Sequence, residues 1–208
     1  MFFLLSGSAA SGKTTLARRL KGQIENLVCH DHDEKRWTPD TTRAAQLEEW
    51  VQLALQHQSK GQDFLLTSHS PLGELLACPS AIELSGIAAG LLDCHDTVRI
   101  QRMWERGVDP KWPPSQHLLN WASWHRMHAW DSQWEQAVIT EGNSAEHDYS
   151  RWTAWQQGDP RWQVDTIDST TSDVDAVIEQ IAAWTRARSS ATQRLSSSSQ
   201  WWQTSLPA

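Results

Sequence analysis

Short apolar runs alternate along the chain with segments whose apolar residues recur at helical spacing. The runs lie at 2–5, 26–29, 63–67, 87–94 and 162–168. Runs of this length are typical of strands buried on both faces of a sheet. Helical spacing is clearest at 42–59, where Leu47, Trp50, Val51 and Ala54 recur on one face. The alternation predicts an α/β protein, a three-layer sandwich in which helices cover both faces of a five-stranded parallel sheet.

The other helices are expected at 14–21, 72–77, 96–106, 115–134 and 172–188, with a further turn or two at 79–84. Polar residues able to cap helix starts are Asp40, Thr41 or Thr42 for the helix at 42–59, and Asp96, Ser115 and Ser172 for later helices. Gly22, Gly61 and Gly107 stand where helices should end. Three prolines exclude regular structure from 109–114. Residues 1–188 therefore form one domain, and the Ser-rich, aperiodic segment 189–208 is expected to be a mobile tail.

Composition limits the classes of protein that fit this chain. Of its 208 residues, 39% are hydrophobic and 21% charged, the balance of a globular protein with a sizeable core. The net charge of −7 argues against a nucleic-acid-coating surface. The apolar start is too short for a membrane span or a signal peptide, so a cytoplasmic location without membrane attachment is expected. Cys29, Cys78 and Cys94 are widely spaced, which predicts reduced, buried thiols.

The first apolar run leads directly into the sequence GSAASGKT, from Gly7 to Thr14. Its spacing, G-x-x-x-x-G-K-T between a strand and a helix, is that of a phosphate-binding loop. Glycines allow the backbone to approach a phosphate closely, and amides at the start of a helix attract anions. Lys13 would reach the β- and γ-phosphate oxygens, and the Thr14 hydroxyl would bind Mg²⁺. The residues expected to bind ATP here are Gly7, Ser8, Ala9, Ala10, Ser11, Gly12, Lys13, Thr14 and Thr15.

A phosphate-binding loop occurs in motors, GTPases and kinases, so further features are needed. The base-recognition motif N-K-x-D and the D-x-x-G switch of GTPases are absent. A second strand ending in acids follows the first helix after about a dozen residues. This order resembles the P-loop kinases of small molecules, a group that includes shikimate and gluconate kinases, chloramphenicol phosphotransferase and zeta-toxin kinases. The resemblance covers 1–188, and it implies the P-loop kinase sheet, ATP and Mg²⁺ as cofactors and a small-molecule acceptor.

The resemblance places an acid at the end of the second strand. Asp31 and Asp33 stand there, and they would share a face if the strand continued through both. A kinase needs a carboxylate to accept the proton of the attacking hydroxyl. We expect Asp31 to be this base and a ligand in the Mg²⁺ shell, and Asp33 to contact substrate, although the two roles are exchangeable. Arg36 is expected to contact substrate as well. A solvated cluster of charges is the alternative.

After the fourth strand, the resembling kinases carry arginines for the nucleotide and for a mobile lid. Arg102 and Arg106 lie one helical turn apart and share a face. We assign Arg102 to the base or phosphates and Arg106 to the γ-phosphate, while a solvated helix face is the alternative. Thr170 follows the fifth strand, in the loop that lies beside adenine in these kinases. One departure stands out, because the third strand ends in Thr67, Ser68 and His69 and not in the Asp of many P-loop enzymes.

The chain contains 14 Trp against 3 Phe and 1 Tyr, and half of the Trp crowd into 107–161. Trp121, Trp124 and His125 share one stripe of a helix. This stripe is either a packed core face or a stacking wall for an acceptor, in the region where the resembling kinases have their lid.

Three functions stay open from sequence alone. The first is a phosphotransferase that moves the γ-phosphate of ATP to a hydroxyl of a nucleoside, sugar or antibiotic-like metabolite. The second is a nucleotide or polynucleotide-end kinase, which should need more Lys and Arg around the acceptor. The third is a non-catalytic ATP-binding module, favoured by the missing Asp after the third strand. The oligomeric state, monomer or homodimer, is left open.

Overall fold

Five parallel strands form one sheet in the order β2-β3-β1-β4-β5. The computed structural model describes all residues except 39, 109–112, 142–145, 172 and 192–208. The central strand β1 pairs with β3 from Phe2–Phe64 to Ser6–Ser68 and with β4 from Phe2–Ile87 to Ser6–Leu91. The strands are β1 (Phe2–Ser6), β2 (Leu27–Asp31), β3 (Asp63–Ser68), β4 (Ile87–Asp93) and β5 (Val164–Asp168). The predicted α/β sandwich around a five-stranded parallel sheet is confirmed.

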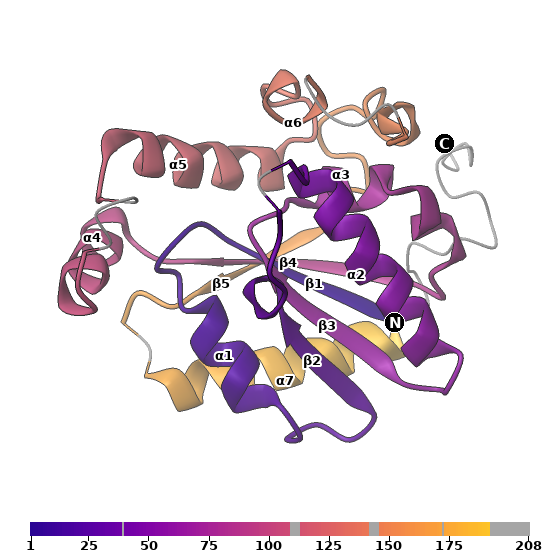
Figure 1. The fold of residues 1–208 in the computed structure, drawn as a ribbon, viewed down its shortest axis with the longest axis horizontal. Coiled ribbons are helices and arrows are strands. Elements are labelled where there is room, and N and C mark those ends of the chain that lie inside the picture. Colours follow the sequence, from indigo (N-terminus) through magenta and orange to yellow (C-terminus); the bar gives the residue numbers. More distant parts are fainter. Residues whose placement is uncertain (39, 109–112, 142–145, 172, 192–208) are drawn as a thin grey trace.

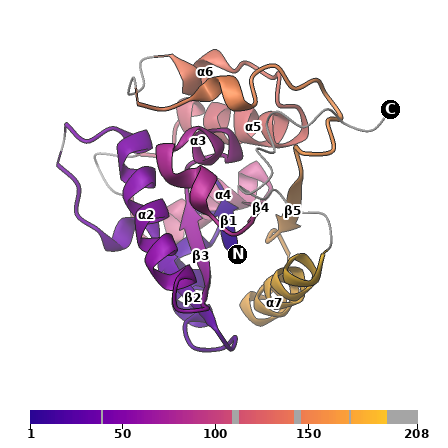
Figure 2. The ribbon, with the colours of Figure 1, turned by 90° about the vertical axis from the view of Figure 1, so that its right-hand side faces the viewer.

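Helices cover both faces of this sheet, as Figures 1 and 2 show. The helix α1 lies beside α7 on one face, while α2 and α3 lie on the other, with α5 crossing above the sheet between α4 and α6. The helices are α1 (Lys13–Leu20), α2 (Arg43–Gln58), α3 (Leu72–Ala77), α4 (Asp96–Glu105), α5 (Gln116–Trp130), α6 (Ala137–Thr140) and α7 (Val174–Ser190). Short 3₁₀ turns, η1 (His32–Glu34), η2 (Pro79–Glu83) and η3 (Tyr149–Arg151), complete the elements.

Alternate side chains of the central strand enter two separate cores. Phe3 and Leu5 pack against α1 and α7, whereas Phe2 and Leu4 pack against α2 and α3. The second core extends into the Trp-rich segment, where it includes Trp124, Trp152, Trp155 and Trp162. Because both faces of β1 are buried, its apolar run has no polar interruption.

Several predicted element ends differ from those in the structure. The helix expected to reach residue 134 ends at Trp130, because the Asp131 carboxylate accepts a hydrogen bond from the Gln133 amide and turns the chain. The start of α4 is capped by His95 and not by Asp96. Ser115 caps α5 as predicted, and α2 is capped by Thr42, one of its three candidate residues. The cap expected at Ser172 and most of the tail expected at 189–208 lie outside the described residues.

The three cysteines are free and buried, as predicted. Among the described residues, no helix is both long and apolar enough for a membrane crossing.

Candidate functional site

The loop between β1 and α1 approaches β4 so closely that its first position must be glycine. A Cβ on Gly7 would lie 2.4 Å from the carbonyl oxygen of Leu92. At the other end of the loop, Gly12 has a φ of 103°, in the left-handed region that favours glycine. Ala10 also has a positive φ, of 59°. Backbone conformations of this kind are held at binding sites by their surroundings.

Four consecutive carbonyl groups of this loop are held by side chains from four different positions. Lys13 donates to the oxygen of Ser8 (2.8 Å), and Arg99 to that of Ala9 (2.5 Å). Arg102 donates to the oxygen of Ala10 (3.5 Å), and Ser169 to that of Ser11 (2.9 Å).

The amides of this loop have no comparable partners. Among the described residues, no protein acceptor takes a hydrogen bond from the amides of 8–15. The loop therefore has its carbonyl oxygens bound and its amide donors available, which is the arrangement that binds an anion.

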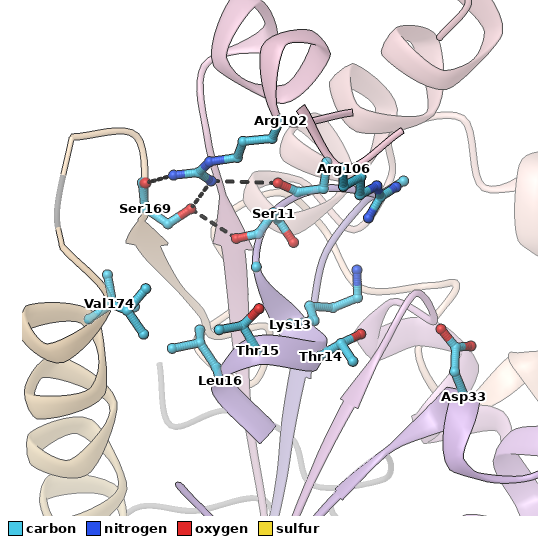
Figure 3. Close-up of a pocket in the computed structure, with 14 residues that line it drawn as sticks. Ser11, Lys13, Thr14, Thr15, Leu16, Asp33, Arg102, Arg106, Ser169 and Val174 are labelled. Carbon is cyan, nitrogen blue, oxygen red and sulfur yellow. Dashed lines mark hydrogen bonds between the residues drawn. The ribbon is translucent and has the colours of Figure 1, made fainter. Parts of the chain in front are cut away.

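A cavity of about 420 Å³ lies against this loop, as Figure 3 shows. Arg102 of α4 and Arg106 directly after it contribute positive charge to its wall, and Asp33 contributes a carboxylate. Val174 and Val177 of α7 supply an apolar patch. The remaining lining residues are Ala9, Ala10, Ser11, Gly12, Lys13, Thr14, Thr15, Leu16 and Ser169.

Lys13 lies in this cavity with its pKa lowered to about 8. Burial of the ammonium is the main cause, and the carboxylates of Asp31 and Asp33 act in the opposite direction. The nearby guanidinium groups of Arg99 and Arg106 add a small lowering. The cavity would therefore stabilise an additional negative charge.

Three arginines in and directly after α4 have three different environments. Arg99 is fully buried, pairs with Asp93, and donates a hydrogen bond to the Ala9 carbonyl oxygen of the loop. Arg102 bonds Ser169 through both its hydroxyl (3.1 Å) and its carbonyl oxygen (2.5 Å), which fixes the guanidinium at the cavity wall. Arg106 is exposed at the cavity mouth, where its side chain is available to a ligand. The placement of Arg102 and Arg106 agrees with the sequence analysis, although their roles stay predictions.

Asp31 and Asp33 do not share a face. The strand ends at Asp31, and the 3₁₀ turn that follows rotates Asp33 into the cavity wall. The Asp31 carboxylate is buried, and it accepts hydrogen bonds from the Thr67 hydroxyl (2.8 Å) and the Asp33 amide (2.9 Å). Asp33 is exposed to the cavity beside Thr14 and Lys13 (Figure 3). The two acids therefore have different surroundings, which their spacing in the sequence did not reveal.

Eight predicted site residues do not line this cavity: Gly7, Ser8, Asp31, Arg36, Trp121, Trp124, His125 and Thr170. Arg36 is exposed and is not among the lining residues. Thr170 points toward β5 and α4, because its hydroxyl donates to Asp168 (2.5 Å) and accepts from the His95 amide (2.8 Å). Its neighbour Ser169 lines the cavity instead, and sequence reasoning missed it. The run of hydroxyl residues after β5 was the available signal, but it could not show which member turns inward.

The Trp-rich helix α5 serves partly as a core face and partly as a wall near Lys13. Trp124 is buried and stacks on Trp121 (4.9 Å between ring centroids) and on His128 (4.6 Å). Trp121 is only partly buried and stacks on Arg43, whose guanidinium carbon is 4.8 Å from the ring centroid. His125 is buried next to it, and burial together with the charge of Lys13 holds its pKa well below the usual range.

The residues of the cavity fit a nucleoside triphosphate and its metal ion. Besides the free amides, the Ser8 and Ser11 hydroxyl oxygens are buried without a hydrogen-bond partner. In the described part of the chain, no three His, Cys, Asp or Glu side chains are placed to hold a metal ion by themselves. Mg²⁺ would therefore take most of its ligands from phosphates, and the Thr14 hydroxyl lines the same cavity.

Comparison with known proteins gives fold-level neighbours. No family model and no curated protein matches this chain. An unliganded sugar kinase from Janibacter sp. HTCC2649 superposes with a TM-score of 0.51 at 15% identity, over 92% of this chain and 98% of that one. The structure of APE1195 gives 0.50 at 14% identity, over 90% and 95%. This chain has their fold. Fold likeness at this identity does not carry function by itself.

Proposed function

We propose that this protein is a P-loop kinase that transfers the γ-phosphoryl group of ATP to a hydroxyl of a small molecule. The observation that carries the proposal is the loop of 8–15, in which side chains hold the carbonyl oxygens of 8–11, the amides have no protein acceptors among the described residues, and residues 9–15 line the cavity. The kinase-like fold, including that of a structure described as a sugar kinase, supports it.

The residues that would hold Mg-ATP differ in the part of the ligand that each would contact. The loop amides and Lys13 would bind the β- and γ-phosphates, and Thr14 would supply a hydroxyl ligand to Mg²⁺. Arg102 is held by Ser169 at the wall, whereas Arg106 is free to neutralise charge on the transferring group. Val174 and Val177 would contact the nucleoside.

The cavity geometry favours Asp33 as the catalytic base. The sequence analysis preferred Asp31, but both oxygens of that carboxylate accept protein hydrogen bonds, and its side chain is buried. Asp33 faces the cavity and can take up the acceptor's proton. In the transfer, the acceptor oxygen bonds to the γ-phosphorus, the bond to the β,γ-bridging oxygen breaks, ADP leaves with that electron pair, and the hydroxyl proton passes to Asp33.

Asp31 occupies the position of the missing acid after β3. Its partner Thr67 is the residue of β3 paired with it in the sheet, so its carboxylate lies beside the end of that strand. From there it would orient water molecules around Mg²⁺. This placement weakens the case for a non-catalytic module.

The proposed function is tested by measuring how tightly a variant of the loop binds Mg-ATP. Lys13→Ala should raise the Kd for Mg-ATP at least about 100-fold, because a charge-assisted contact and its support of the loop are both lost. Titration calorimetry measures this, and the matched control is Lys60→Ala, which removes an exposed lysine. Absence of Mg-ATP binding by the unsubstituted protein would refute the proposal.

A further inference from the structure

A second group of polar and aromatic side chains, none of which lines the nucleotide cavity, includes two histidines that lie near enough to Lys13 to feel its charge. His69 follows β3, His125 and Trp121 come from α5, and Arg43 comes from α2. Three of them are in contact, because the Trp121 and His125 centroids are 5.2 Å apart and Arg43 stacks on Trp121 at 4.8 Å, while the ring of His69 packs on His32 at 4.7 Å. Lys13 and Arg43 lie close enough to act on the charge of both histidines. Segments distant in sequence thus meet beside the predicted γ-phosphate site.

His125 is the least explained of these groups. Its side chain is 2% exposed, yet neither ring nitrogen has a hydrogen-bond partner. Buried polar atoms without partners are rare in folded proteins, and a ligand is one of the ordinary explanations. A neutral imidazole offers one donor and one acceptor, which is the pair that an alcohol also offers.

The same environment keeps both histidines uncharged. Burial lowers the pKa of His69 to about 3, and it holds that of His125 well below the usual range. For His69 the nearby His32 adds to the lowering, and for His125 the next contribution comes from Lys13. Neither ring therefore supplies a cation to a bound molecule at neutral pH.

The positive charge of Arg43 is already matched. Its Nε lies 2.7 Å and 2.9 Å from the two carboxylate oxygens of Glu74, and an Nη also bonds that carboxylate. Glu74 is fully buried, so separating this pair would leave an uncompensated buried charge. Arg43 therefore acts as a neutral pair with Glu74 and as a stacking partner for Trp121. A carboxylate or phosphate on the acceptor would find no unpaired guanidinium in this cluster.

We infer that the acceptor is an uncharged molecule carrying several hydroxyl groups, held by the ring nitrogens of His69 and His125 beside Trp121. The inference rests on the proposed function and narrows its acceptor to a neutral sugar, polyol or nucleoside. A site that hydrogen-bonds hydroxyl groups discriminates strongly, because its polar groups are left unpaired by a molecule that lacks them. An anionic acceptor would instead be desolvated without a counter-charge.

The first experiment compares matched acceptors with Mg-ATP. Glucose is paired with gluconate, ribitol with ribonate, and adenosine with AMP, and the rate of ADP release is measured for each. Transfer to a neutral member at ten times or more the kcat/KM of its charged partner is expected. Preference for the charged members overturns the inference while leaving the proposed kinase function intact.

The second experiment measures the protonation state of the two histidine rings and does not depend on catalytic turnover. Nitrogen NMR of ¹⁵N-histidine protein, recorded at pH 7 with a non-hydrolysable ATP analogue, should show neutral rings for His69 and His125. Adding the preferred neutral acceptor should shift both sets of ring resonances, and adding its charged partner should not. An imidazolium ring at either position overturns the inference. So does Mg-ATP binding without any transfer or resonance shift from the whole panel, whereas absent Mg-ATP binding marks failure of the kinase proposal itself.

A variant separates a contact with the acceptor from a structural role. His125→Asn should raise the acceptor KM about tenfold, with the Kd for Mg-ATP unchanged, since one hydrogen-bonding position is lost. His117→Asn, at an exposed position of the same helix, is the control and should change neither. If His125→Asn alters only the melting temperature and leaves the acceptor KM unchanged, His125 is a core residue and the inference fails.

Discussion

Two neighbouring aspartates differ in burial, and this difference predicts their kinetic roles. Asp33→Asn should lower kcat by about 10²–10⁴, the usual contribution of a general base, with little change in the Kd for Mg-ATP. Asp31→Asn should instead raise the Mg²⁺ concentration needed for activity and lower the melting temperature, because asparagine keeps only one oxygen for the two donors, the Thr67 hydroxyl and the Asp33 amide. Steady-state rates across a Mg²⁺ titration distinguish the two. Asp40→Asn, at an exposed position, is the control. Equal loss of kcat in both variants would contradict this assignment.

The lowered pKa of Lys13 predicts that nucleotide binding takes up a proton at alkaline pH. In the free protein the ammonium loses its proton around pH 8, whereas phosphates beside it favour the charged form. Binding is therefore undiminished below pH 8 and weakens as the pH rises above it. Calorimetry at pH 9 in two buffers of different ionisation enthalpy should give an uptake approaching one proton, and at pH 6.5 almost none. Lys13→Arg should abolish the uptake, since arginine stays charged. Identical enthalpies in both buffers at pH 9 would contradict the expectation.

At the level of elements, α3 packs so closely on the Trp-rich segment that its glycine cannot gain a methyl group. A Cβ on Gly73 would lie 2.6 Å from the ring of Trp152, which is fully buried. Gly73→Ala should therefore destabilise the fold by about 3 kcal/mol despite the better helix propensity of alanine. Gly158→Ala is the comparison, because nothing lies near its Cβ and only the positive φ opposes it, at about 1 kcal/mol. Urea unfolding measures both, and a smaller loss for Gly73→Ala would refute tight packing there.

The elements themselves were largely readable from the sequence, since strand and helix periodicities are local properties. The five strands and the cap at Ser115 agree with the structure, and Thr42 is the one of the three candidate residues that caps α2. The direction of a side chain after a strand end was not readable. The turn at His32 decides that Asp33 enters the cavity, and the hydrogen bond to His95 decides that Thr170 does not. Both depend on contacts between segments distant in sequence, which periodicity does not encode.

At the scale of the whole molecule, one of the two cores is shared by the sheet and the Trp-rich segment. The core that starts at β1 continues through Trp124, Trp152 and Trp162. If the whole of 107–161 moved as a lid, Trp124 and Trp152 would have to leave this core. We therefore expect the described core residues to stay fixed during turnover, and any movement of the segment to involve residues outside the core.

His128 lies inside this core and should make the whole fold sensitive to acid. It packs between Trp124 (4.6 Å) and Trp162 (5.0 Å), and burial lowers its pKa to about 4 from the ordinary 6.5. Between these two values the unfolded chain binds a proton that the folded chain excludes. His128 alone should therefore lower the free energy of unfolding by about 1.4 kcal/mol for each pH unit between 6.5 and 4, in addition to the effects of the other buried histidines.

One substitution isolates this contribution from those of other buried groups. His128→Phe keeps an aromatic ring between the two indoles but cannot take a proton. Its unfolding free energy, measured by urea titration from pH 7 to pH 4.5, should decline less steeply than that of the unsubstituted protein, by about 1.4 kcal/mol per pH unit. His117→Gln removes an exposed histidine of the same helix and should leave the slope unchanged. Parallel pH profiles for His128→Phe and the unsubstituted protein would show that the ring is already solvated, and that the Trp-rich segment opens independently of the sheet.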